Sequence, residues 1–240
     1  LVGTQSAQQW VGRFGFDVDK HPPYLTMALG AGSVTPMQMA VGYGVFANGG
    51  YRVAPTLITR IADHKGKVLF EAAEAQLSDA QRAIEPRNAF IMNSLLQEIT
   101  RSGTAARAQA TLKRTDLFGK TGTTNDSVDA WFAGYQPTIA AVTWIGYDTP
   151  RNLGSRETGG GLSLPIWISF MSQALKDVTV TQYTPPPGVI NVGGEWYFEE
   201  FGPGNGVHGL GLQDPWPGAA PIAMDPANAP PIHPPPDDYR

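Results

Sequence analysis

Four stretches of the chain are predicted to be helical from their pattern of apolar and polar residues. The first runs from Gln5 to Phe14. The last, Ile166–Lys176, is apolar on most sides and is therefore predicted to be buried. The second has clear start signals: Thr35 is a candidate cap, Pro36 suits the first helical position, and Gln38 completes a capping box. These signals predict a helix that begins at Pro36.

The two central helices also carry predicted apolar faces. The second should end at Asn48-Gly49-Gly50, since glycine accepts the left-handed conformation. The third should begin at Pro86. For the second helix the expected face is Met37, Ala40, Val41, Gly44 and Val45, and for the third it is Ala89, Met92, Leu95, Leu96 and Ile99.

Strand-like runs follow one another with short connections. The candidates are Leu57–Ala62, Val68–Glu71, Leu117–Thr123, Val128–Gln136 and Ile139–Tyr147. Pro137 marks the turn between the last two. Short connections favour antiparallel pairing, and helices lie before and after the strands. The predicted fold class is therefore α+β, an antiparallel sheet flanked by helices.

Proline divides the chain into two regions. Residues 183–240 hold 13 of the 21 prolines and seven acidic residues against one basic residue, Arg240. We expect this region to be an acidic, partly disordered Pro/Gly-rich tail after a folded part at residues 1–182. The apolar patch Glu195–Phe198 is expected to pin part of the tail onto the domain. The last 20 or so residues are predicted to be disordered or in polyproline-II conformation.

Composition and charge exclude several kinds of protein. The net charge of −4 argues against a general nucleic-acid binder. The absence of cysteine excludes disulfides, thiolate metal sites and a cysteine nucleophile. The four histidines lie far apart in the sequence, so we expect no metal site and no cofactor. No apolar run reaches the roughly 18 residues that a membrane span needs.

The most informative stretch for chemistry is Gly119–Asn125, GKTGTTN. Lys120 offers a compact positive charge, the hydroxyls of Thr121 and Thr123 can bind a carboxylate, and Gly122 leaves room for substrate against the backbone. The triplet K-T-G alone fits a polar turn between strands equally well. A phosphate-binding loop is excluded because Arg114 occupies its first glycine position. The match to G-x-G-x-x-G at 204–209 lies in the tail, without a strand–helix context.

Five longer segments add to this triplet: Thr26–Val53, Arg101–Thr104, Asp116–Pro137, Thr143–Asp148 and Thr158–Met171. Together they resemble the class A (bifunctional) penicillin-binding proteins. K-T-G is one of the motifs of these proteins and of serine β-lactamases. The resemblance spans about residues 5–176 and implies the C-terminal part of a D,D-transpeptidase domain. It implies the penicillin-binding/serine β-lactamase-like fold with its N-terminal part missing.

The resemblance also implies a role for each residue of the motif. Lys120 would support the electrostatics and the proton relay, and Thr121 and Thr123 would hold the terminal carboxylate of the substrate. The Thr123 N–H would form half of the oxyanion hole, with Gly122 beside it. Thr124 and Asn125 would line the substrate site. The implied partners are peptidoglycan stem peptides and β-lactam antibiotics.

Two motifs of the family are absent from the chain. No serine stands three residues before any of the six lysines, so there is no S-x-x-K, and no serine stands two residues before any asparagine, so there is no S-x-N. We expect the chain to be truncated and inactive unless an upstream segment supplies the nucleophilic serine. Alternatives are a non-catalytic cell-wall binding module, or a serine β-lactamase relative.

The resemblance further implies a location and additional partners. The site would face the periplasm at the bacterial inner membrane, held there through a missing N-terminal anchor. The tail is expected to contact regulators of cell-wall synthesis. We expect no contact with nucleic acid.

Overall fold

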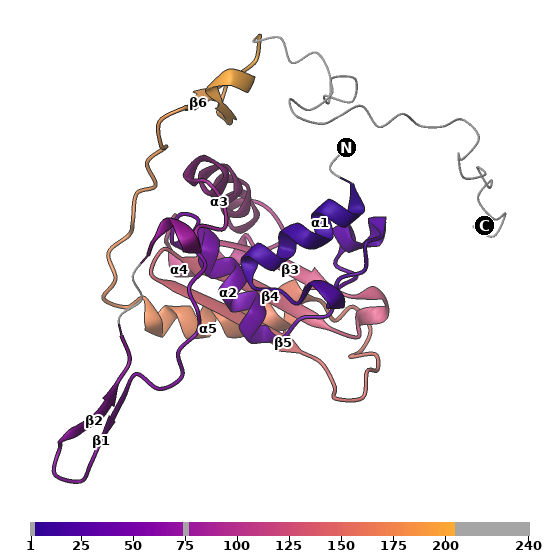
Figure 1. Cartoon of the computed structure of the whole chain (residues 1–240). Coiled ribbons are helices and arrows are strands. Elements are labelled where there is room, and N and C mark those ends of the chain that lie inside the picture. The colour runs from indigo at the N-terminus through magenta and orange to yellow at the C-terminus, as the bar shows by residue number, and fades with distance from the viewer. Residues whose placement is uncertain (1–2, 74–76, 205–240) are drawn as a thin grey trace, which may run out of the picture. The chain divides into compact units, whose positions relative to one another are not determined.

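A three-stranded antiparallel sheet with helices on both faces forms the centre of the fold in the computed structural model (Figure 1). The structure describes residues 3–73 and 77–204, and residues 3–202 of these belong to one compact unit. The strand order is β3-β4-β5, with β3 at Phe118–Thr123, β4 at Ala130–Gln136 and β5 at Ile139–Ile145. The predicted α+β class is confirmed.

The register of the sheet sets which face each side chain occupies. Lys120 pairs with Ala133, and Gly122 pairs with Trp131, which in turn pairs with Trp144. Successive side chains of a strand point to opposite faces. Lys120 and Gly122 therefore share one face of the sheet, while Thr121 and Thr123 share the other.

The helices largely follow their predicted positions. Their bounds are α1 Thr4–Val11, α2 Pro36–Ala47, α3 Pro86–Arg101, α4 Arg107–Leu112 and α5 Leu164–Ala174. Short 3₁₀ turns occur at Gly12–Phe14, Val18–Lys20, Leu25–Leu29, Asp79–Gln81, Asn125–Ser127 and Glu199–Phe201, and one π-helical turn at Gly159–Ser163. The short helix α4 was not predicted.

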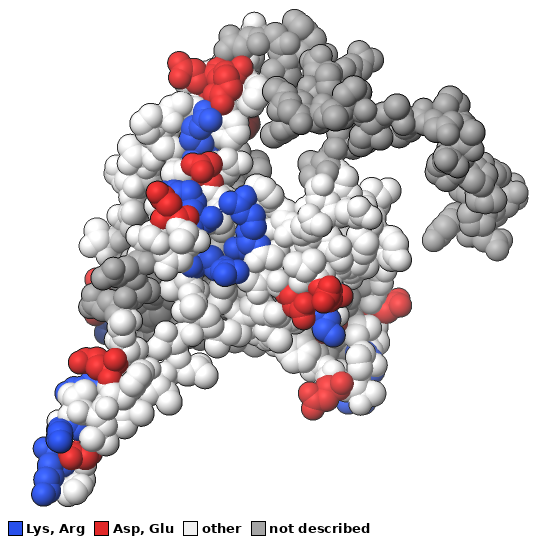
Figure 2. Space-filling view, viewed as in Figure 1, with Lys and Arg blue, Asp and Glu red and all other residues white. Residues whose placement is uncertain are grey.

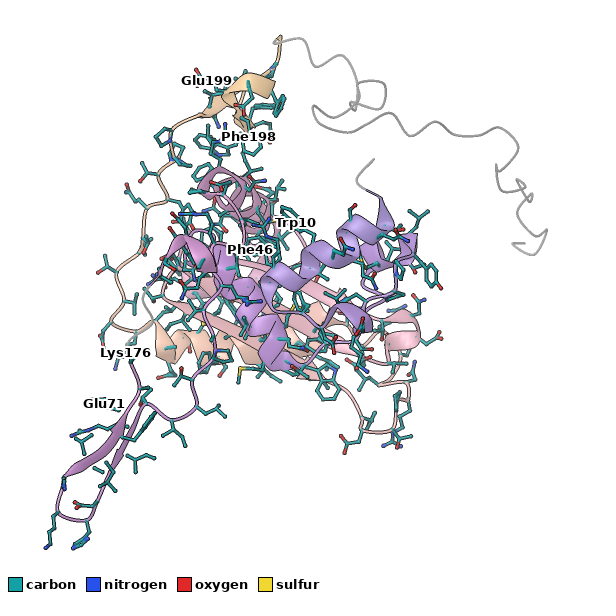
Figure 3. All side chains as sticks on the ribbon, viewed as in Figure 1. Trp10, Phe46, Glu71, Lys176, Phe198 and Glu199 are labelled. Carbon is teal, nitrogen blue, oxygen red and sulfur yellow. The ribbon has the colours of Figure 1, made fainter. Side chains whose placement is uncertain are left out.

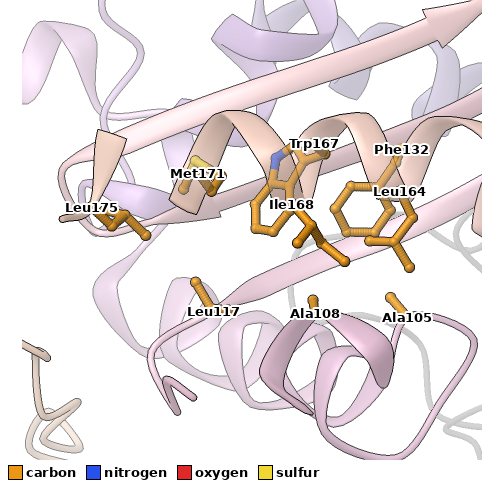
Figure 4. Close-up of a cluster of buried hydrophobic side chains, with 9 residues drawn as sticks. All are labelled: Ala105, Ala108, Leu117, Phe132, Leu164, Trp167, Ile168, Met171 and Leu175. Atoms are coloured by element: carbon orange, nitrogen blue, oxygen red, sulfur yellow. The ribbon is translucent and has the colours of Figure 1, made fainter. Parts of the chain in front are cut away.

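One face of the sheet is covered by α4 and α5. Their buried side chains form a cluster with the start of β3 and the middle of β4 (Figure 4). Trp167 of α5 is fully buried, lies edge-on to Phe132 with ring centroids 4.9 Å apart, and donates its indole N–H to the Ala141 carbonyl at 3.1 Å. Burying an apolar side chain of this size contributes about 2–3 kcal/mol. This cluster packs against β3, the strand that contains the K-T-G triplet, and holds it in place.

The opposite face is covered by α2 and α3. Phe118 stacks on Tyr135 with ring centroids 5.0 Å apart, and Phe46 of α2, labelled in Figure 3, packs against this cluster. Asn93 of α3 is buried and donates to the Phe46 carbonyl at 3.2 Å; it also accepts from the Tyr135 hydroxyl and donates to the Tyr183 hydroxyl. Burial raises the pKa of Tyr135 and of Tyr183, so both phenols stay neutral.

The capping box of α2 is present as predicted. The Thr35 hydroxyl accepts from the Gln38 backbone N–H at 3.1 Å, and the Gln38 side chain accepts from the Thr35 N–H at 2.9 Å. The predicted apolar face was only partly right, because Met37 is 49% exposed while Gly42 and Val45 are buried. Nearly every residue of this helix is apolar, so its sequence does not single out one face.

The predicted face of α3 was also partly wrong. Met92 and Leu95 are exposed, Ala89 and Leu96 are buried, and the helix buries Phe90, Asn93 and Thr100 as well. The buried side is therefore rotated toward two polar residues. Thr100 donates its hydroxyl to the Leu117 carbonyl at 2.6 Å, which satisfies it inside the fold.

A C-terminal hairpin, with β6 at Val189–Val192 and β7 at Glu195–Phe198, packs against α3. The Trp196 ring lies edge-on to Phe90, with centroids 5.0 Å apart, and Arg87 pairs with Glu200 at 2.8 Å. The expected pinning by Glu195–Phe198 is confirmed. The boundary at residue 182 stays a prediction. The predicted disorder of the last 20 residues lies outside the described residues, as does most of the 204–209 glycine pattern.

A second hairpin joins α2 to α3. Strands β1, Arg60–Ala62, and β2, Val68–Glu71, pair antiparallel, and every residue of both strands is exposed. Its turn is closed by the Asp63 carboxylate, which accepts from the backbone N–H groups of Lys65 and Lys67 at 2.8 and 2.9 Å.

On the face of the molecule seen in Figure 2, charged side chains occur in small groups.

Candidate functional site

The K-T-G-T motif forms the outer end of an edge strand. Strand β3 pairs with β4 on one side only, and no other strand of the described residues pairs with its second edge. Lys120 and Thr123 are exposed, and Thr121 and Gly122 are half-buried. An exposed edge strand presents unpaired backbone groups to which an extended peptide can bind. The motif thus combines a free edge with accessible side chains.

Lys120 lies along this edge. Its ammonium donates to the Thr121 carbonyl at 2.9 Å and lies 3.5 Å from the Thr121 hydroxyl oxygen. No carboxylate among the described residues forms an ion pair with it. The positive charge is therefore free to attract an anionic group of a ligand.

The two threonines of the motif face the other side of the sheet. The Thr121 hydroxyl lies 2.7 Å from that of Thr104, in the connection between α3 and α4. The Thr123 hydroxyl accepts from the backbone N–H of Gly159 at 3.1 Å. The Thr121 hydroxyl therefore has two polar neighbours, Thr104 and the Lys120 ammonium, and the Thr123 hydroxyl has one. Both hydroxyls keep further hydrogen-bonding capacity.

Gly159 begins the π-helical turn that lies against the motif strand. A Cβ there would lie 2.2 Å from the Trp131 carbonyl oxygen and 2.4 Å from that of Gly122. Only glycine permits this close approach of two backbones. Thr158 caps the turn by accepting from the Gly161 N–H at 3.1 Å. The stretch 159–161 is thus a packed turn.

Thr124 and Asn125 follow the strand directly. The Thr124 hydroxyl accepts from the Asp129 backbone N–H at 2.7 Å, so it closes the turn into β4. Asn125 is exposed, and the structure gives its side chain no hydrogen bond within the described residues. Of the Thr124 and Asn125 side chains, the Asn125 amide therefore has more hydrogen-bonding capacity left for a ligand.

Asp116 anchors the start of the motif strand. It is buried and receives a two-pronged contact from Arg114, at 2.9 and 2.8 Å, together with the Thr181 N–H at 2.9 Å and the Gln136 amide at 3.1 Å. Burial alone would raise the pKa of Asp116, but these hydrogen bonds outweigh it and lower the pKa. The carboxylate is therefore held charged and fixes the strand.

The sequence-predicted residues Lys120 to Asn125 lie together at one end of β3. Thr104 and Gly159 also contact this group and received no role from the sequence. The signal for Thr104 was its place in the R-S-G-T segment, and that for Gly159 was a run of three glycines.

A cavity of about 560 Å³ is lined by Arg13, Asp79, Arg82, Glu85 and Pro86, and by none of the motif residues.

The comparisons with known proteins define the family. The family described as the penicillin binding protein transpeptidase domain matches residues 1–171, and the chain belongs to it. The chain is 44% identical to penicillin-binding protein 1A of Neisseria flavescens over 200 residues, which cover 83% of this chain and 25% of that protein. Penicillin-binding protein 1A of Pseudomonas aeruginosa is 39% identical, with 80% of this chain and 29% of that protein covered.

Solved structures agree in fold. Penicillin-binding protein 1A from Haemophilus influenzae matches with a TM-score of 0.73 and 33% identity, covering 78% of this chain and 33% of that one. The penicillin-binding protein PonA1 from Mycobacterium tuberculosis matches with a TM-score of 0.59 and 26% identity, covering 71% and 49%. The chain spans about a quarter of the length of the Neisseria relative.

Helices long and apolar enough to cross a bilayer do not occur among residues 3–73 and 77–204.

Proposed function

We propose that this chain provides the K-T-G wall of a serine D,D-transpeptidase that cross-links peptidoglycan stem peptides. The observation that carries the proposal is the Lys120–Thr123 segment on a strand edge, where Lys120 and Thr123 are exposed. No carboxylate of the described residues forms an ion pair with the Lys120 ammonium. Membership of the transpeptidase family supports the reaction class. The similar proteins are named for binding penicillin.

The reaction proceeds by acyl transfer in two steps. A serine hydroxyl attacks the carbonyl carbon between two D-alanines and loses its proton to a base. The C–N bond breaks, and D-alanine leaves with a proton. The amine of a second stem peptide then attacks the ester and loses a proton. The C–O bond to the serine breaks, the serine oxygen takes up a proton, and the new amide is the cross-link. Splitting the transfer in this way lowers each barrier.

Each motif residue has a part in this chemistry. Lys120 attracts the carboxylate end of the donor peptide and stabilises the charge that develops during proton transfer. The hydroxyls of Thr121 and Thr123 hold the terminal carboxylate, with Gly122 leaving space against the strand. The Thr123 N–H stabilises the oxyanion, a contribution that typically amounts to about 3 kcal/mol. Thr124 and Asn125 line the substrate site.

The nucleophile has to come from sequence outside these 240 residues, because they contain neither S-x-x-K nor S-x-N. We therefore place this chain within a longer protein at the periplasmic face of the bacterial inner membrane. The relatives, more than three times as long, support this placement. Its partners are stem peptides and β-lactams, and regulators of cell-wall synthesis through the tail.

Acylation by penicillin tests the proposal. The native protein, purified from its source, is treated with labelled penicillin, and its intact mass and acylation rate are measured. The wild type should gain the mass of one penicillin, and Lys120→Ala should slow acylation at least tenfold. Lys176→Ala is the matched control, since Lys176 is exposed and its side chain forms no hydrogen bond or ion pair within the described residues. Equal rates for wild type and Lys120→Ala would refute the role of Lys120.

A non-catalytic cell-wall binding module is the second candidate. The absence of S-x-x-K from these 240 residues favours it. Its signature would be a native protein that takes up no penicillin but sediments with purified peptidoglycan.

A further inference from the structure

The turn after the motif strand, residues 124–129, has a disfavoured backbone. Asp126 has φ 58° and ψ 20°, and Ser127 has φ 49°. Both values are left-handed, and neither residue is a glycine. Two adjacent left-handed residues persist only where surrounding contacts hold them, and such positions concentrate at functional sites.

Contacts from the sheet side hold this turn. The backbone of Asp129 pairs with Thr124 twice: the Asp129 N–H donates to the Thr124 hydroxyl at 2.7 Å, and the Thr124 N–H donates to the Asp129 carbonyl at 3.1 Å. The Asp129 carboxylate accepts the indole N–H of Trp144, on β5, at 2.7 Å. Asp129 thereby connects Thr124, which follows β3, to Trp144 on β5, and β4 lies between these two strands.

Contacts from a second segment hold the other side. The Asn152 side-chain amide donates to the Asp126 carbonyl, and the Leu153 N–H donates to the Ser127 carbonyl at 2.9 Å. Asn152 is itself fixed, because its amide oxygen accepts from the Gly154 N–H at 2.8 Å. Both left-handed residues therefore have their carbonyl groups bound.

Asp129 is also linked to the motif through the packing of two tryptophan side chains. The Trp144 ring lies 5.9 Å from that of Trp131, centroid to centroid. Trp131 is the cross-strand partner of Gly122, and a Cβ on Gly122 would lie only 3.2 Å from the Trp131 Cβ. A shift of Trp144 would therefore reach the motif strand through packing as well as through the turn.

We propose that Asp129 is a positioning residue for acyl transfer. Its carboxylate fixes Trp144, and its backbone fixes Thr124, so that the Thr123 N–H and the Thr124 side chain keep one orientation before substrate arrives. Preorganised donors stabilise developing charge without reorganising during the reaction, and this requires a supporting layer of contacts. The inference rests on the proposed function, because Thr123 is assigned to the oxyanion there.

The test compares variants of the native protein. Asp129→Ala removes the acceptor for Trp144, Asp129→Asn keeps an acceptor oxygen, and Trp144→Phe removes the donor. We measure the acylation rate at saturating penicillin, the penicillin concentration for half-maximal rate, the melting temperature, and hydrogen exchange at the backbone amide of Asp129. Asp177→Ala is the matched control, since Asp177 is exposed and its side chain forms no hydrogen bond or ion pair in the described part of the chain.

A tenfold to hundredfold slower acylation step is expected for Asp129→Ala, on the order of the loss that misplacement of reacting groups causes. The concentration for half-maximal rate should change less, and exchange at the Asp129 amide should become faster. Asp129→Asn should restore most of the rate. The double variant with Trp144→Phe should lose little more than either single variant, because the two residues act through one hydrogen bond.

Two results would overturn the inference, and they differ. A reactive wild type with an equally reactive Asp129→Ala would refute the positioning role alone. A slower Asp129→Ala whose loss tracks a fall in melting temperature, without rescue by Asn, would show a merely structural role. A wild type that takes no penicillin would instead refute the proposed function, whatever hydrogen exchange reports about the turn.

Discussion

The hydroxyl oxygens of Thr104 and Thr121 lie 2.7 Å apart, although 17 residues separate them in the chain. Thr104 stands where α3 gives way to α4, and Thr121 is the central residue of the motif. Their hydrogen bond ties the motif side chain to the helical layer. It thus determines how the Thr121 hydroxyl is presented at the strand edge.

Replacing Thr104 should weaken the site without unfolding it. Thr104→Val keeps the shape and removes the hydroxyl, so penicillin acylation should slow by about fivefold, the equivalent of one neutral hydrogen bond. Thr104→Ser, which keeps the hydroxyl, should react like the wild type. Measured acylation rates that are equal for Val and Ser would contradict the orienting role.

Gly159→Ala should disturb both stability and reactivity. The new methyl group would overlap the Trp131 and Gly122 carbonyl oxygens, so the π-helical turn must move away from the motif. We expect a loss of about 1–3 kcal/mol in the free energy of unfolding, together with slower acylation. Gly161→Ala is the control in the same turn, because its Cβ would meet only the Thr158 hydroxyl at 3.4 Å. Equal melting temperatures for the two variants would contradict the close-approach argument.

Asn93→Ala should destabilise the helical layer on the α2/α3 face. It leaves the buried Tyr135 hydroxyl, the half-buried Tyr183 hydroxyl and the Phe46 carbonyl without their common partner. A cost of about 2–3 kcal/mol is expected from unsatisfied buried groups, measured by urea unfolding. Asn88→Ala, at an exposed position of the same helix, should cost little. A small effect at Asn93 would mean that water replaces the amide.

Asp116 should make stability depend on pH in the acid range. Its pKa is lower in the folded protein than in the unfolded chain, where an aspartate titrates at about 3.9. Its stabilising contribution is therefore complete above that value and is lost as pH falls through the lower, folded pKa. Asp116→Asn cannot titrate, so the stability advantage of wild type over this variant should shrink below about pH 4. Urea unfolding at pH 6 and pH 2.5 measures it; an unchanged advantage would refute the assignment.

Local chemistry predicts the start of α2 well. The caps involve Thr35 and Gln38, which lie three residues apart, so the sequence contains all the partners. The buried side of α3 could not be predicted in the same way. Asn93 and Thr100 are buried because Tyr135 and the Leu117 carbonyl satisfy them, and those partners come from later strands.

The candidate site also contains residues that a local motif predicts and residues that only the folded structure brings together. Lys120 to Asn125 are consecutive, so a motif predicts them together. Thr104 and Gly159 reach the motif from 17 and 36 residues away, and their hydrogen bonds exist only after the sheet and helices pack. Asp129 follows the motif by only a few residues, but its link to Trp144 depends on the pairing of β4 with β5.

The exposed β1–β2 hairpin offers an attachment point for spectroscopic probes. Lys65 at its tip uses only its backbone N–H, which donates to Asp63, so its side chain is replaceable. The chain contains no cysteine, so Lys65→Cys would place a single thiol within this sequence. A fluorophore or spin label there would report on the motion of the domain while leaving the motif strand untouched.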